Sequence, residues 1–133
     1  MLGNRTALPV AALALAISSA AAAALEPKPV NDASFEADII QPSRQTPVAV
    51  VFVAAWCGPC RVITPAVWDL ATQYEGRVTF ATLDVDQSSS APMTYGVSSL
   101  PTTVLFKGGQ VVDKKLGAMS KDILEKWIAP HAR

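Results

Sequence analysis

A continuous apolar run covers residues 48–54, where no polar residue occurs and no alternation is visible. Such a run predicts a strand that is buried on both faces, at the centre of a sheet covered by helices. Residues 78–85 and 102–106 are further β-rich runs. A Gly-Gly pair then predicts a tight hairpin turn into a strand at 111–113, so the last two strands are expected to be antiparallel.

Apolar residues at helical spacing mark two long segments between and after these strands. The segment from Pro59 to Tyr74 carries one apolar stripe, which Pro65 should kink and not end, because the period continues past it. Ser120 is expected to cap a closing helix that Pro130 ends. The residues expected to be buried on these helices are Val62, Ile63, Ala66, Val67, Leu70, Ala71 and Tyr74 on the first, and Ile123, Leu124, Trp127 and Ile128 on the second.

Two shorter helical segments are expected at 35–40, after capping side chains at 31–34, and at 91–95. The element order is therefore helix, strand, helix, strand, helix, strand, strand, helix. Strand-helix-strand units imply right-handed parallel crossovers, and the terminal hairpin adds an antiparallel edge. The prediction is an α/β fold: a mixed central sheet with helices on both faces, ending in an antiparallel hairpin and a helix.

The first 24 residues have a different character from the rest. Arg5 precedes an apolar run that ends at Ile17, and small residues with an Ala22-x-Ala24 site follow. A basic start, an apolar core of this length and a small-x-small site are the three parts of a secretory signal. We therefore expect a cleaved signal peptide at 1–24, one domain at 25–133, and a periplasmic or extracellular location. An uncleaved membrane anchor is the alternative, because the apolar stretch approaches the roughly 18 residues that span a bilayer.

Composition narrows the possible functions. With 11 Lys+Arg and 11 Asp+Glu, the formal net charge is +0, which gives no electrostatic reason to expect nucleic acid as a partner. A hydrophobic fraction of 50% excludes a disordered chain. Two Cys alone make neither a disulfide-rich scaffold nor a zinc site. A metal would need two further ligands, for which His131 is the remaining candidate, so we expect no metal and no cofactor.

Cys57 and Cys60 stand where the central strand ends and the helix begins. A helix N-terminus presents unpaired N–H groups and about half a positive charge, which stabilise a thiolate on Cys57. Cys60 lies one turn later and is placed to attack the mixed disulfide that Cys57 would form with a substrate. A structural disulfide is the alternative, but closing so short a loop stabilises by only about 2 kcal/mol. The spacing therefore favours a redox-active dithiol over a structural disulfide or a metal site.

Four motifs follow one another in an order that is typical of one family. They are 52–61 (FVAAWCGPCR), 97–102 (VSSLPT), 106–109 (FKGG) and 117–121 (GAMSK). Together with Pro65 they resemble the active-site signature, the cis-proline segment, the hairpin, the glycine-bearing turn and the helix-kinking proline of the thioredoxin family. The resemblance extends over residues 30–129.

The resemblance implies a thioredoxin fold and a monomeric protein-disulfide oxidoreductase in which Cys57 attacks and Cys60 resolves. It implies a cis peptide at Leu100-Pro101 that exposes the backbone of Leu100 for strand-like pairing with substrate. An ordinary turn proline at 101 and a core-packed Trp56 are the alternatives. The residues expected to bind substrate around the dithiol are Trp56, Gly58, Pro59, Leu100, Pro101 and Gly117.

The chain departs from the family at several positions. Val51 stands where typical thioredoxins have a buried aspartate, and Thr82 where they have its partner lysine. In the family that acid is assigned to proton transfer at the buried cysteine. We therefore expect a shallower pH dependence around neutrality here, and slower resolution of the mixed disulfide. Pro27 and Pro29 also leave the N-terminal strand of the family poorly supported.

Three functions compete on this sequence. The favoured one is an exported reductase that receives electrons from a membrane donor and passes them to disulfide-containing exported proteins. A disulfide-forming oxidant or isomerase on the same fold is the second, and a non-catalytic interaction protein the third. The Gly-Pro dipeptide between the cysteines resembles the reducing members, whereas an exporting compartment keeps thiols oxidised.

Overall fold

A five-stranded mixed sheet lies at the centre of the computed structural model, which describes residues 25–133; the predicted signal peptide lies outside the described residues. The strands are β1 (Lys28–Val30), β2 (Val48–Val53), β3 (Thr79–Asp84), β4 (Thr102–Lys107) and β5 (Gln110–Leu116). Their spatial order is β1-β3-β2-β4-β5. The central β2 runs parallel to β3 and antiparallel to β4, and all of its residues except Val53 are buried, which confirms the prediction of a buried central strand.

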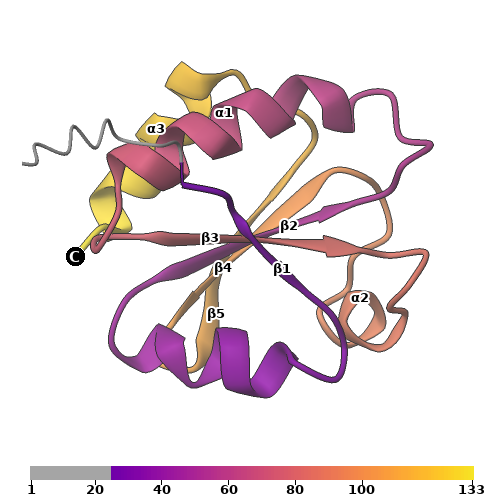
Figure 1. Ribbon diagram of the computed structural model, residues 1–133, viewed down its shortest axis with the longest axis horizontal. Helices are drawn as coiled ribbons and strands as arrows, with labels where there is room; N and C mark the ends of the chain where they lie inside the picture. The colour runs from indigo at the N-terminus through magenta and orange to yellow at the C-terminus, as the bar shows by residue number, and fades with distance from the viewer. Residues whose placement is uncertain (1–24) are drawn as a thin grey trace, which may run out of the picture.

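Helices cover both faces of this sheet (Figure 1). The helical elements are η1 (Glu36–Ile40), η2 (Pro42–Arg44), α1 (Cys60–Gln73), α2 (Ser90–Thr94), α3 (Lys121–Ile128) and η3 (Ala129–His131). One apolar core lies between the sheet and the pair α1 and α3, and a second lies between the other face and the η1 and α2 side. The α/β class with a mixed sheet and helices on both faces is therefore confirmed. The first predicted helix is a short π-helical turn.

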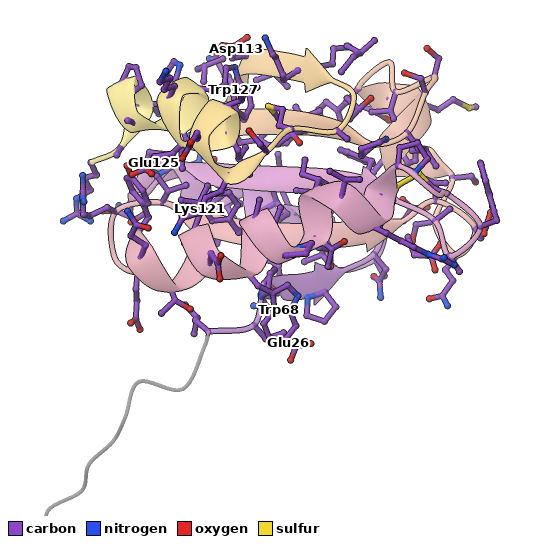
Figure 2. All side chains as sticks on the ribbon, turned by 90° about the horizontal axis from the view of Figure 1, so that it is seen from above. Glu26, Trp68, Asp113, Lys121, Glu125 and Trp127 are labelled. Atoms are coloured by element: carbon purple, nitrogen blue, oxygen red, sulfur yellow. A yellow bond between two sulfur atoms is a disulfide. The ribbon has the colours of Figure 1, made fainter. Side chains whose placement is uncertain are left out.

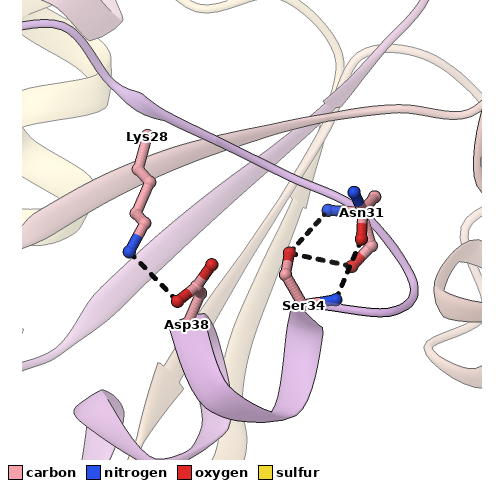
Figure 3. A network of polar contacts seen from close by, with 4 residues as sticks. All are labelled: Lys28, Asn31, Ser34 and Asp38. Carbon is pink, nitrogen blue, oxygen red and sulfur yellow. Dashed lines mark hydrogen bonds and ion pairs between the residues drawn. The ribbon is translucent and has the colours of Figure 1, made fainter.

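The N-terminal strand that the prolines argue against is present, so that expectation is wrong. β1 has three residues and pairs in parallel with β3, with Pro29 opposite Thr82. Because β1 lies at the edge of the sheet, one side of its backbone needs no partner and proline is tolerated there. Lys28 also fixes the strand to η1, since its Nζ lies 3.0 Å from Asp38 Oδ1, and Asn31 and Ser34 hydrogen-bond each other in the turn before η1 (Figure 3).

A carboxylate from the segment after β1 caps α2. The backbone N–H groups of Ser90 and Ala91 donate to Asp32 Oδ2 and Oδ1 at 2.9 and 2.8 Å. The sequence places Asp32 among the capping residues of the first helix, but η1 has no side-chain cap. Asp32 therefore caps α2 and not the first helix. The sequence does not show this contact because the free N–H groups of α2 meet the carboxylate only after the sheet has brought distant segments together.

Two residues expected on buried helix faces are exposed. Val62 is 60% exposed and Ile123 is 52% exposed, whereas the neighbouring Ile63 and Leu124 are 0% exposed. Consecutive helix residues project about 100° apart, so an apolar residue beside the buried stripe can face solvent. Figure 2 shows Trp127 of α3 near Asp113 of β5, and its Nε1–H donates to Asp113 Oδ2 at 2.8 Å.

Replacing Tyr74 by Phe should remove a pH-dependent part of the stability. The Tyr74 hydroxyl donates to Glu125 Oε2 of α3 at 2.8 Å, and this bond, with burial and the charge of Glu125 adding to it, raises the pKa of Tyr74. A raised phenol pKa contributes stability that is complete below the unfolded-state value of 10.0 and is lost as pH rises through the folded value. Tyr74→Phe should cost about 1 kcal/mol at neutral pH.

Denaturant unfolding of both proteins from about pH 8 to pH 11 checks this expectation, because the window begins near the unfolded-state pKa. The wild type should lose its advantage over Tyr74→Phe as pH rises. Burial, and then the charge of Glu36, raises the pKa of Tyr95 as well, but that residue is common to both proteins and cancels in the difference. A constant difference across the range would contradict the role given to Glu125.

Candidate active site

The two cysteines lie at the junction predicted for them. Cys57 follows β2 in a turn, Cys60 is the first residue of α1, and the two form a disulfide with a Cα–Cα distance of 5.4 Å. Both are buried, each 4% exposed. The connection between β2 and α1 is short because the backbone N–H of Cys57 bonds to the carbonyl of Ala54, and this bond turns the chain directly from the strand into the helix.

The start of α1 supplies a hydrogen-bond donor to the first cysteine. The backbone N–H of Cys60 donates to Cys57 Sγ at 3.2 Å. Pro59 precedes the helix as its N-cap residue, where the missing N–H of a proline costs no intrahelical bond. The same amide and the helix dipole favour negative charge on Cys57 Sγ once the disulfide is reduced. The site is therefore built to form a thiolate on Cys57.

Trp56 stands beside the dithiol as a surface residue. It is 70% exposed, which excludes the alternative of core packing, and its Nε1–H donates to Asp86 Oδ1 at 3.2 Å. From the sequence, Asp86 is expected to be no more than solvated surface. Its placement follows from topology: β2 and β3 are parallel, so the residues after both strands meet at the same edge of the sheet. A carboxylate two residues beyond β3 is the only sequence signal for this contact.

The proline segment lies against the dithiol, as the resemblance implies. The Leu100-Pro101 peptide is cis, and Leu100 packs against the cluster formed by Ala54, Cys57 and Cys60. The carbonyl of Pro101 accepts a 2.8 Å bond from the N–H of Gly117, whose φ of +92° suits glycine. Gly58 and Pro59, two of the predicted substrate-binding residues, are exposed. A substrate could therefore reach them from solvent, although the sulfurs beside them are buried.

On the three inner strands β3, β2 and β4, the row of residues below the dithiol carries no charged side chain. Val51 is opposite Thr82 of β3 and Thr103 of β4, and it is 1% exposed. Because residues in register point to the same face, these three side chains lie on the face covered by α1. The family resemblance points to Val51 and Thr82 but not to Thr103, because the position of Thr103 beside Val51 depends on the register of an antiparallel strand pair.

The remaining candidate for a metal ligand lies elsewhere. His131 Nε2 is 3.9 Å from Asp113 Oδ2, next to α3. Across residues 25–133, no group of three or more His, Cys, Asp or Glu side chains is arranged to hold a metal ion. The helices described in this range include none that is long and apolar enough to cross a membrane.

Comparison with known proteins identifies the same family that the motifs resemble. A sequence model of the Thioredoxin family matches residues 26–130. The thioredoxin of Synechocystis sp. is 44% identical over 102 residues, which cover 77% of this chain and 94% of the relative. The thioredoxin of Rhodospirillum rubrum is 44% identical over 101 residues, covering 76% and 95%. The resemblance inferred from the motifs is thus confirmed, and the chain belongs to the thioredoxin family of thiol-disulfide oxidoreductases.

Proposed function

We propose that this protein is an exported thioredoxin-like disulfide reductase that acts on disulfide-containing exported proteins. The observation that carries its chemistry is the 3.2 Å bond from the Cys60 N–H to Cys57 Sγ at the start of α1, beside exposed Trp56. The Gly58-Pro59 dipeptide supports the reducing direction through its resemblance to reducing members. The signal-like sequence at 1–24, which precedes the family match, supports export.

The reducing reaction has two exchange steps. The Cys57 thiolate attacks one sulfur of a substrate disulfide, and the other substrate sulfur leaves as a thiolate that takes a proton from solvent. The Cys60 thiol then loses its proton and attacks Cys57 Sγ, which releases the second substrate sulfur and forms the disulfide seen in the structure. Two electrons pass to the substrate. A membrane donor must return them, because exporting compartments do not keep thiols reduced.

Leu100 and Trp56 supply apolar surface around the buried sulfurs. Together with the backbone of Leu100, this surface suits an extended segment of a protein substrate that pairs with the chain as a strand does. No cofactor takes part in either exchange step, because each step only trades one S–S bond for another.

The reduction potential of the Cys57/Cys60 pair tests the direction of the reaction. The measurement equilibrates the purified protein with a series of glutathione buffers and quantifies the oxidised fraction by alkylation and mass spectrometry. We expect a value below about −220 mV, which lies on the side of thioredoxin and the glutaredoxins. A value at or above about −180 mV, the range of protein disulfide isomerase and of stronger oxidants, would make the protein an oxidant or isomerase and overturn the reductase.

The mass of the N-terminus after expression in a secreting host tests the export. A chain that begins at Leu25 in the exported fraction supports cleavage after Ala24. An intact chain in the membrane fraction would replace cleavage by anchoring. An intact chain that stays in the cytoplasmic fraction would contradict export, while leaving the exchange chemistry of the dithiol unaffected.

A further inference from the structure

Thr103 carries a buried hydroxyl without a hydrogen-bond partner. The residue is 0% exposed, and among the described residues its Oγ1 is the buried side-chain oxygen or nitrogen atom found with no partner. Folded proteins pair nearly all such groups with protein atoms or ordered water, because leaving one unpaired is costly. The neighbouring Thr102, also buried, follows that rule and donates to the carbonyl of Ser99 at 2.7 Å. An orphan hydroxyl at 103 therefore points to a further bonded partner.

The register places this hydroxyl below the dithiol. Thr103 is opposite Val51, on the sheet face that α1 covers, and two residues after Pro101. Val53, one step along that face from Val51, packs both against the core under α1 and against the cluster that contains Cys57 and Cys60. Thr103 thus adds a polar group to an apolar layer that continues up to the buried cysteines.

The second exchange step needs a polar group near Cys60 that helps to remove the proton of its thiol. When Cys57 is bonded to substrate, Cys60 is a buried thiol, and its S–H proton must leave before the sulfur can attack Cys57. Val51 has no carboxylate to accept this proton. The register brings three titratable groups of the neighbouring strands to this face: half-buried Asp84 is opposite Val53, exposed Lys115 is opposite Thr103, and half-buried Asp113 is opposite Leu105 and bonded to Trp127. Arg61 on α1 is exposed as well.

We propose that Thr103 is a positioning residue for proton transfer from Cys60: its hydroxyl holds a buried water molecule below the start of α1, and this water takes the thiol proton. The proton passes from Cys60 Sγ to the water and on to solvent. The Cys60 sulfur then bonds to Cys57 Sγ, the bond from Cys57 to the substrate breaks, and the substrate sulfur leaves with the electron pair and picks up a proton from solvent. The inference rests on the exchange reaction of the proposed function.

A hydroxyl and a water differ from a carboxylate in one measurable respect. Neither changes its charge between pH 5 and pH 9, so the resolving step should follow a single titration, that of the Cys60 thiol, without a second inflection from a buried acid. The pH profile of resolution therefore separates the Thr103 arrangement from one that depends on Asp84, whose replacement by Asn should leave the profile unchanged.

The test measures the two exchange steps separately in Thr103→Val, Thr103→Ala and Thr103→Ser. Stopped-flow mixing of the reduced protein with a disulfide peptide gives the first step, and release of the peptide from the mixed disulfide gives the second. Positioned acid-base groups contribute roughly 10²-fold or more, and a group that acts through water should contribute less. We expect about tenfold slower release in the Val and Ala variants, with release in Thr103→Ser within about twofold of wild type.

The controls separate this proposal from damage to the fold and from the proposed function. Formation of the mixed disulfide by Cys57 should keep its wild-type rate, and the denaturation midpoint of Thr103→Val should stay close to that of wild type, because loss of the bond from the hydroxyl to water is offset by removal of a buried polar group, with little change in side-chain shape. Wild-type release in both the Val and the Ala variants would overturn the proposal. So would slower release in Asp84→Asn with Thr103→Val unaffected. Failure of wild type to reduce the peptide at all would instead overturn the reductase.

Discussion

Replacing Cys57 by serine should abolish disulfide exchange, with a fall of at least about 10³-fold in the rate of reaction with a disulfide peptide. Cys57 Sγ is the sulfur that accepts the N–H of Cys60, and Cys60 is itself the first residue of the helix. A serine hydroxyl in the same place is not ionised near neutral pH and cannot form a disulfide, so the amide has no thiolate to stabilise. Loss of substrate thiol release in a fluorescence assay measures the effect.

Cys60→Ser is the matched variant, because it removes the other sulfur of the same pair. It should react with the peptide once, at a rate near that of wild type, and then stay covalently attached to it, since no second thiol is present to release the substrate. Intact-protein mass spectrometry should show one peptide per chain. The assignment of the two roles would be reversed if Cys57→Ser trapped the peptide and Cys60→Ser did not react.

The fold could be predicted from the chain because its strongest patterns are local. The apolar run of β2 has no alternation, and a fully buried central strand is the result. The position of Cys57 and Cys60 between that strand and α1 could be predicted as well, because it too is visible in a short stretch of sequence. β1 was missed because its three residues are stabilised by pairing with β3 and by the Lys28–Asp38 contact, neither of which is visible in a local pattern.

Two parts of the site are not visible in the sequence, and both depend on pairing between strands that are distant in the chain. Asp86 reaches Trp56 only because parallel strands end at one edge. Thr103 becomes notable only when the register of β2 and β4 sets it opposite Val51 and burial leaves its hydroxyl without a partner. A family resemblance explains which residue type is absent at Val51, whereas the structure identifies what stands beside it. Motifs therefore define the reacting sulfurs, and strand register defines their surroundings.

Leu124→Ala should give a large loss of stability, about 3 kcal/mol, in the free energy of unfolding. Leu124 is 0% exposed and belongs to the core between the sheet, α1 and α3. α3 has only eight residues, of which Leu124 and Ile128 are the buried ones, so truncating Leu124 removes much of what packs this helix against α1. Proteins of this size are stable by roughly 5–15 kcal/mol. Denaturant unfolding followed by circular dichroism measures the difference.

Ile123→Ala is the control that makes this result specific, because the two residues are neighbours on the same helix and lose similar side-chain volumes. Ile123 is 52% exposed, although its apolar character predicts a buried position. Its replacement should change the free energy of unfolding by no more than about 0.5 kcal/mol, and the higher helix propensity of alanine acts against a loss. Equal losses in the two variants would mean that α3 packs on both residues. A loss confined to Leu124→Ala would show that only one face of α3 packs against the core. Which of two adjacent apolar residues lies on that face depends on the 100° rotation per residue of the helix and not on how apolar each residue is.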